Sequence, residues 1–148
     1  MTNKINTSAF AVRYAKELEH KTIGYLQGTA PTQHYKDYLA ALDDYDLLDC
    51  SHPLLQLADT EADAQKAALE FLRHRPRGFR FPSIFIAPSD AIALGAMTAF
   101  RDLGYHIPED ISFIGYGNAP EGAAFEPPLT TIDVNGNLIE RDSVFDLR

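Results

Sequence analysis

The sequence has few of the features that would place it outside the cell or in a membrane. Its single cysteine, Cys50, excludes an internal disulfide and fits a reducing compartment. No stretch approaches the roughly 20 consecutive apolar residues that a membrane-spanning helix needs. The polar N-terminus contains no apolar core of an export signal. We therefore expect a cytoplasmic protein without a membrane partner.

Positive charge is also scarce. The 148 residues carry 13 lysines and arginines against 21 aspartates and glutamates, which gives a net charge of −8. Because phosphate binding needs a basic surface, this segment is not expected to hold nucleic acid by itself. One basic cluster contains Arg73, His74, Arg75, Arg77 and Arg80. It could be an anion or nucleic-acid patch, but cations at a helix C-terminus, followed by a solvated loop, are the favoured interpretation.

Catalytic and cofactor motifs are missing as well. There is no G-x-S-x-G elbow and no glycine-rich phosphate loop. The histidines are not spaced from one another, or from Cys50, as metal ligands usually are. Ser89 and Asp90 follow an apolar run, where such residues usually cap a helix. We therefore expect no enzyme, no metal and no cofactor; a small α/β enzyme would need a catalytic constellation that the sequence does not display.

The sequence does contain strands and helices in alternation. We expect helices at 4–18, with Ser8 as its cap, at 33–47, from Asp59 or Thr60 to 74, at 90–104, and from 138 onward. Strands are expected at 22–27, 53–57, 83–87, 111–116 and 130–134, and an irregular loop at 118–126. This alternation predicts an α/β fold with a parallel sheet of about five strands in the order 2-1-3-4-5, flanked by helices on both faces.

The helix expected at 90–104 is apolar nearly all round. Ile92, Leu94, Met97, Phe100 and Leu103 are joined by several alanines, and polar residues are few before Arg101. A surface helix needs only an apolar stripe, so the outer side of this helix must also be covered. We interpret it as a docking surface.

The stretch 83–118, SIFIAPSDAIALGAMTAFRDLGYHIPEDISFIGYGN, resembles the effector-binding region of LacI/GalR-type (lactose-repressor family) transcriptional regulators. That family shows an apolar strand, an Asn-Asp-x-x-Ala-x-Gly helix, Leu-Gly-x-x-x-Pro-x-Asp-Ile-Ser, and a strand ending Gly-Tyr/Phe-Asp. The segment 127–132, PPLTTI, resembles the next strand. His20 stands at the family's Gly-His-x-x-Ile position, and we interpret it as a structural residue.

The resemblance implies a periplasmic-binding-protein-like type I lobe. Residues 1–148 would form the C-terminal lobe of the effector-binding domain and end inside the helix that returns to the first lobe. The DNA-binding helix-turn-helix and the first lobe would lie outside this chain, so DNA would be a partner only through that other domain.

Effectors of such folds bind beyond the carboxyl ends of the strands. The resemblance places effector-binding residues at His34, Ser89, Asp90, Gly117 and Asn118. Three of these depart from the family pattern: His34 stands for an arginine, Ser89 for an asparagine and Gly117 for an aspartate. Ser89 could equally serve only as a helix cap. These three side chains are shorter and carry less charge than those of the family pattern. We therefore expect a ligand unlike those of the common sugar repressors, or a weakened site.

The resemblance also implies a homodimer. In the family the apolar helix and the loop before the two prolines form the contact, and the matching residues are Leu94, Met97, Thr98, Arg101 and Phe125. The alternative is that the outer face of this helix is covered by the first lobe or by the loop at 118–126.

These observations together predict the effector-sensing and dimerisation part of a LacI-type regulator, which binds a small carbohydrate-like molecule. A sugar-binding transport protein of related fold is the first alternative, and a small α/β enzyme is the second.

Overall fold

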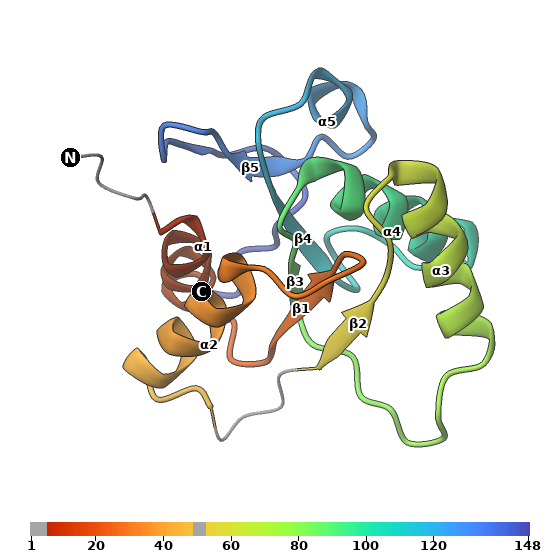
Figure 1. The fold of residues 1–148 in the computed structure, drawn as a ribbon, viewed down its shortest axis with the longest axis horizontal. Helices are drawn as coiled ribbons and strands as arrows, with labels where there is room; N and C mark the ends of the chain where they lie inside the picture. The colour runs from red at the N-terminus through yellow and green to blue at the C-terminus, as the bar shows by residue number, and fades with distance from the viewer. Residues whose placement is uncertain (1–5, 49–52) are drawn as a thin grey trace.

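A computed structural model describes residues 6–48 and 53–148, so Cys50 and His52 lie outside the described residues. Figure 1 shows one sheet with helices on both faces. The strand order is β2-β1-β3-β4-β5-β6, and the first five strands run parallel, which confirms the predicted order. The strands are β1 (Ile23–Gln27), β2 (Leu54–Gln56), β3 (Ile84–Ile86), β4 (Ser112–Tyr116), β5 (Thr130–Ile132) and β6 (Leu138–Ile139). The helices are α1 (Thr7–Glu17), α2 (Gln33–Asp44), α3 (Glu61–Arg73), α4 (Asp90–Asp102) and α5 (Pro120–Ala124).

The sheet divides the core into two layers. Helices α1 and α2 cover one face, and α3 and α4 cover the other (Figure 1). Along β1, Ile23 and Tyr25 point into the α1–α2 layer, whereas Leu26 points into the α3–α4 layer. All five residues of β1 are buried, as expected for a parallel strand that is covered on both faces.

Side chains at the helix starts confirm two of the predicted caps and correct a third. The Thr60 and Ser89 hydroxyls accept hydrogen bonds from the third residue of α3 and α4, at 3.1 and 3.3 Å. Helix α1 is capped by Asn6, whose Oδ1 accepts from the Ala9 N–H at 2.9 Å, so the prediction of Ser8 was wrong. Ser8 instead donates to the carbonyl of His34 at 2.8 Å, which ties α1 to the start of α2.

Helix α3 covers the outer side of α4. A Cβ on Gly95 would lie 2.5 Å from the Glu61 carbonyl oxygen and 2.8 Å from the Gln65 nitrogen, so the two backbones approach closely there. Leu94 and Met97, with exposed fractions of 1% and 0%, are core residues of the chain itself. The prediction that these two residues face a partner is therefore wrong, because both are buried within the chain and α3 packs on the outer side of α4.

The chain after β5 forms a hairpin instead of a helix. The Asp133 carboxylate accepts hydrogen bonds from the backbone of Asn135 and Asn137, both at 2.9 Å, and Gly136 has a positive φ of 85°. These hydrogen bonds hold the pKa of Asp133 below its ordinary value, and the bond from the Asn137 backbone has the largest effect. Strand β6 then pairs antiparallel with β5. The prediction of a helix from 138 is wrong. Asn135–Gly136 is a hairpin turn sequence, and it outweighs the helical spacing of the apolar residues that follow it.

The segment predicted as an irregular loop contains the short helix α5. Pro120 begins it, and the fixed backbone angle of proline suits the first helical position. The carbonyl of Gly122 then accepts from the Leu129 N–H at 2.9 Å, which returns the chain to β5.

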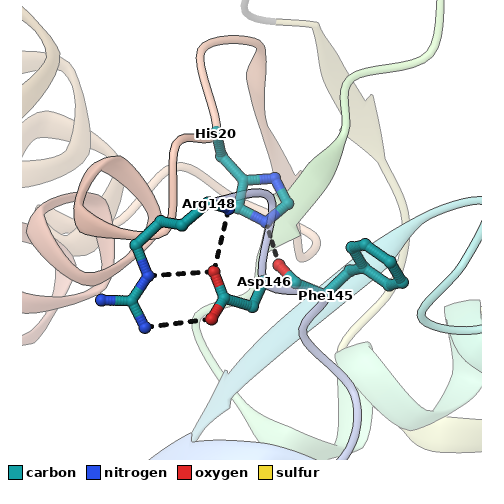
Figure 2. Close-up of polar contacts among 4 residues, drawn as sticks. All are labelled: His20, Phe145, Asp146 and Arg148. Atoms are coloured by element: carbon teal, nitrogen blue, oxygen red, sulfur yellow. Dashed lines mark hydrogen bonds and ion pairs between the residues drawn. The ribbon is translucent and has the colours of Figure 1, made fainter.

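The residues after β6 lie back against α1 and β4. Phe113 and Ser143 exchange hydrogen bonds, and the Leu147 N–H donates to the Leu18 carbonyl at 3.0 Å. Figure 2 shows the His20 ring pointing at the Phe145 carbonyl oxygen, which accepts from Nε2 at 2.8 Å. The other ring nitrogen lies 2.7 Å from the Ser83 hydroxyl. His20 is thus a buried structural residue beside β1, as predicted, and its burial lowers the pKa of the imidazole.

We predict that Gly95→Ala destabilises the chain, although alanine normally favours a helix. The added methyl group would press on the α3 backbone, which cannot rotate away as a side chain can, so we expect a loss of about 1–3 kcal/mol in the free energy of unfolding. Urea unfolding measures this loss. The control is Thr98→Ala on the same helix, which should change stability by less than about 1 kcal/mol. A neutral or stabilising Gly95→Ala would contradict the close helix contact.

We also predict that His20 contributes to the pH dependence of stability. Its pKa in the folded chain lies below the ordinary value of 6.5, chiefly because burial disfavours the charged ring; the Phe145 carbonyl and Asp146 act in the opposite direction. The unfolded chain therefore binds this proton more readily, and the free energy of unfolding should fall as the pH drops below 6.5.

Urea unfolding at pH 7.5 and 5.5 tests this dependence. His20→Gln should show a smaller loss between the two pH values than the unaltered chain. The control is His106→Gln, which alters a histidine on the surface and should keep the full loss. An equal loss in His20→Gln would rule out this role.

Candidate functional site

The carboxyl ends of the parallel strands bring His34 against Tyr116. His34 lies in the first turn of α2, and Tyr116 is the last residue of β4. Their rings are 5.2 Å apart between centroids, and the Thr7 Oγ1 lies 3.3 Å from the His34 Nδ1. The cavity beside this pair measures about 10 Å³, which is about the space of one water molecule. A sugar-sized molecule would therefore lie over the strand ends and not inside this cavity.

Tyrosines hold the helix that carries His34 on the sheet. The Tyr25 and Tyr38 rings lie 5.0 Å apart, and Tyr35 packs on both. The Tyr38 hydroxyl donates to the Ile23 carbonyl at 2.6 Å, and its burial raises the pKa of that hydroxyl. Burial also raises the pKa of Tyr25 to about 12. Tyr25 and Tyr38 therefore stay neutral at physiological pH, and the packing of the three rings fixes α2, and with it His34, relative to β1.

Ser89 caps α4 at the end of the neighbouring strand β3. Its hydroxyl oxygen accepts from the Ile92 N–H, and the residue is half-buried. A serine hydroxyl also carries one hydrogen that it can donate. Capping and ligand contact are therefore compatible at this position.

Asp90 has a supporting position. It is 2% exposed, and its two carboxylate oxygens accept from the Thr131 hydroxyl at 2.7 Å and from the Ala119 N–H at 2.6 Å. A Cβ on Gly115 would overlap the carboxylate, at 2.2 Å from Oδ1, so the glycine makes room for it. The prediction that Asp90 contacts an effector directly is therefore corrected. Its buried carboxylate instead holds the loop after β4 in place.

Gly117 and Asn118 form that exposed loop. Gly117 has a φ of 116°, a region that L side chains rarely adopt, and Asn118 has a φ of 55° in the left-handed region that asparagine tolerates. The Gly117 N–H donates to the Ile132 carbonyl at 2.8 Å. The Asn118 Oδ1 accepts from the Arg141 guanidinium at 2.8 Å. This backbone conformation suits glycine and would strain the aspartate that the family pattern has at this position.

A polar cluster lies at the ends of β1 and β2. The Gln27 amide donates to the Gln56 Oε1 at 2.9 Å, and Gln56 donates in turn to the Gly28 carbonyl. The Gln27 Oε1 is buried and has no hydrogen-bond partner among the described residues. Asp59 accepts from the Thr29 N–H, and hydrogen bonds from Thr29 lower the pKa of its carboxyl.

Sequence reasoning placed His34, Ser89, Gly117 and Asn118 at strand or helix ends but missed their partners. Tyr116 was predicted only as the end of the strand at 111–116, although ligands bind beyond the carboxyl ends of parallel strands. Thr7 and Ser8, which contact His34, lie near the N-terminus of the chain. Arg141, which donates to Asn118, lies in a segment that was expected to be helical. Only the packing of α1 on α2 and the β5–β6 hairpin bring these residues to the site.

Other kinds of site find no support in the part of the chain that the structure describes. Within it, no three His, Cys, Asp or Glu side chains gather closely enough to hold a metal ion. Nor does any of its helices have the length and hydropathy needed to cross a membrane.

Residues 12–144 match the family model of the periplasmic binding protein-like domain. The chain is 31% identical over 137 residues to the HTH-type transcriptional repressor PurR of Actinobacillus pleuropneumoniae, and this match covers 89% of the chain and 39% of the relative. It is 34% identical over 131 residues to the HTH-type transcriptional repressor CytR of Escherichia coli, which covers 85% of the chain and 37% of the relative. The chain thus spans less than half the length of these relatives, whose names describe repressors.

Solved structures show the same fold. A LacI family transcriptional regulator from Enterococcus faecium with bound ribose superposes with a TM-score of 0.78 at 21% identity, over 95% of this chain and 63% of the other. A dimeric Lac repressor superposes with a TM-score of 0.78 at 19% identity, over 94% of this chain and 61% of the other. The chain belongs to the periplasmic binding protein-like domain family, as an effector-binding domain of the LacI/GalR type.

Proposed function

We propose that residues 1–148 form one lobe of the effector-sensing part of a LacI-type transcriptional regulator. A small carbohydrate-like molecule binds over the carboxyl ends of β1, β3 and β4, facing a second lobe. The observation that carries this proposal is the gathering of polar and aromatic side chains there, with His34 against Tyr116. DNA is contacted through a separate domain, and a regulator of transcription acts in the cytoplasm, where the DNA is.

The chemistry of this edge suits a neutral ligand that carries both donors and acceptors. An aromatic ring such as that of Tyr116 can pack on the face of a sugar or a base, while His34 and Ser89 offer short hydrogen-bonding groups. The Gln27 Oε1 adds a buried acceptor at the end of β1. The positions where the family has arginine and aspartate hold His34 and Gly117, so the site lacks the charge pair that grips a polyhydroxylated sugar. We therefore expect ribose and galactosides to bind weakly.

We predict that His34→Ala lowers affinity for the effector at least tenfold. The change removes the ring that faces Tyr116 but leaves the backbone carbonyl that holds Ser8. Isothermal titration calorimetry against ribose, lactose, adenosine and guanosine monophosphate identifies the best ligand, and a repeat with the variant measures the loss.

The control is His106→Ala, an exposed histidine just after α4, near the amino end of β4, which should bind normally. Amide chemical shifts then locate the bound molecule, and we expect changes at 33–35, 88–90 and 116–118. Full affinity in His34→Ala, or shifts confined to other segments, would contradict the proposed site. Tight binding of ribose or lactose would contradict the expected change in specificity.

We propose in addition that the regulator is a homodimer, and that the contact uses the exposed end of α4. Thr98 is half-buried and Arg101 exposed. The Arg101 guanidinium lies 4.7 Å over the Phe125 ring and donates to the Glu126 carbonyl at 3.1 Å. Arginine and aromatic residues are enriched at the centres of protein interfaces, and here the loop fixes both in place.

We predict that the double variant Arg101→Glu, Phe125→Glu is monomeric, because it puts charge at the centre of this contact. Light scattering after size exclusion gives the mass. Leu54→Glu, which alters an exposed residue of the edge strand β2, is the control and should remain dimeric. An unchanged dimer mass in the double variant would exclude this surface.

A further inference from the structure

A large hollow on the described surface lies at the end of the sheet away from the proposed effector site. It is an open cavity of about 730 Å³ between the end of α3, the loop before β3 and the segment after α4. Ile111 in its wall directly precedes β4, and Phe81 lies three residues before β3, so the cavity sits at the amino ends of these strands. In Figure 1 the loop between α3 and β3 lies at the end of the molecule away from α5. A volume of this size suits a small molecule.

The floor and one wall of the cavity are apolar and rigid. Leu72 and Ile111 are buried in the core beneath it. The Phe81 ring packs edge-on against Phe100 and Tyr105, at 5.7 and 5.5 Å between centroids. Because Phe100 is fully buried, these contacts anchor the wall to the core of the α3–α4 layer. A flat apolar group could stack there without reorganising the protein.

The rim of the cavity is positively charged. Arg73 and Arg75 line it, and a neighbouring open hollow shares both and adds Arg77. With Arg80, four of the 13 basic residues of a chain of net charge −8 lie within this one short segment. None of the four forms an ion pair with a carboxylate elsewhere in the described residues.

The helix dipole accounts for part of this cluster. Arg73 lies in the last turn of α3, and the Arg75 Nη1 donates to the Leu72 carbonyl at 2.9 Å, as expected of cations at a helix C-terminus. The same contact, together with the stacking of the guanidinium 5.6 Å from the Phe81 centroid, fixes Arg75 at the cavity wall. A guanidinium has five N–H donors, and the helix carbonyl takes one of them.

One carboxylate also lines the cavity. The Asp110 Oδ2 accepts from the His106 N–H at 2.7 Å and lies 3.7 Å from the His106 ring nitrogen. The Asp110 carboxylate is thus bonded within its own loop. Because Arg73 and Arg75 carry two positive charges against this one negative charge, the lining stays positive.

We propose that this cavity is a second small-molecule site, which takes a ligand with a flat aromatic body and a carboxylate or phosphate group. The body packs against Phe81 and Tyr105, and the anionic group accepts hydrogen bonds from Arg73 and Arg75. Such a site lies apart from the strand ends that hold His34, so its occupation does not depend on the effector proposal.

The test uses phenyl phosphate as the probe, with benzyl alcohol as an uncharged substitute for its aromatic half and inorganic phosphate as its anionic half. Two-dimensional amide NMR follows each titration. We expect phenyl phosphate to shift resonances at 72–81 and 103–111, and to bind at least tenfold more tightly than either half. Equal binding of benzyl alcohol would show an apolar hollow only, and equal binding of inorganic phosphate would show an adventitious ion only; either result overturns the proposal.

Variants make the test specific. Arg73→Gln removes a cation that holds no other described group, and should weaken phenyl phosphate binding at least fivefold with the fold intact. Arg73→Gln, Arg75→Gln should abolish it. Lys66→Gln, which removes the same charge from an exposed position of α3, should stay within twofold of the unaltered chain. Retained affinity in a folded Arg73→Gln variant, or shifts that map to 33–35 and 116–118, would overturn the proposal.

Discussion

The buried carboxylate of Asp90 is the constraint on which the arrangement of the strand ends depends. A buried charge is costly unless hydrogen bonds replace its water, and here the Thr131 hydroxyl and the Ala119 N–H do so. Each of these donors would cost about 1–3 kcal/mol if it were left buried without a partner. Asp90 begins α4, so a single side chain joins the end of β3 to β5 and to the loop after β4. The positions of Ser89 and Asn118 follow from this junction.

The fold was largely predictable because the sequence patterns of strands and helices are repeated along the chain. Buried strands such as β1 and β3 read as short apolar runs, and the caps at Thr60 and Ser89 stand directly before their helices. The hairpin at Asn135–Gly136 was missed because the apolar residues that follow, Leu138 and Ile139, also suit a helix. The turn forms there because the Asp133 carboxylate accepts hydrogen bonds from the backbone N–H groups of Asn135 and Asn137.

The candidate site was less predictable, because it depends on contacts between distant segments. The sequence around His34 does not predict its ring contact with Tyr116. The two residues are 82 positions apart, and only the sheet topology brings them together. The apolar character of α4 was correctly recognised as needing cover on two sides, but composition alone does not say what covers it. The contact of α3 with Gly95 answers that question, and it leaves Arg101 and Phe125 as the centre of the interface that we propose.

We propose that the carboxyl ends of β3 and β4 receive the effector. A co-crystal structure with the most tightly bound compound of the sugar and nucleoside panel tests it most directly. We expect the compound to lie over these strand ends, within hydrogen-bond distance of His34, Ser89 or Asn118, with Asp90 still bonded to Thr131 and Ala119. A compound bound at the opposite edge, with no atom near β3 or β4 at their carboxyl ends, would contradict it.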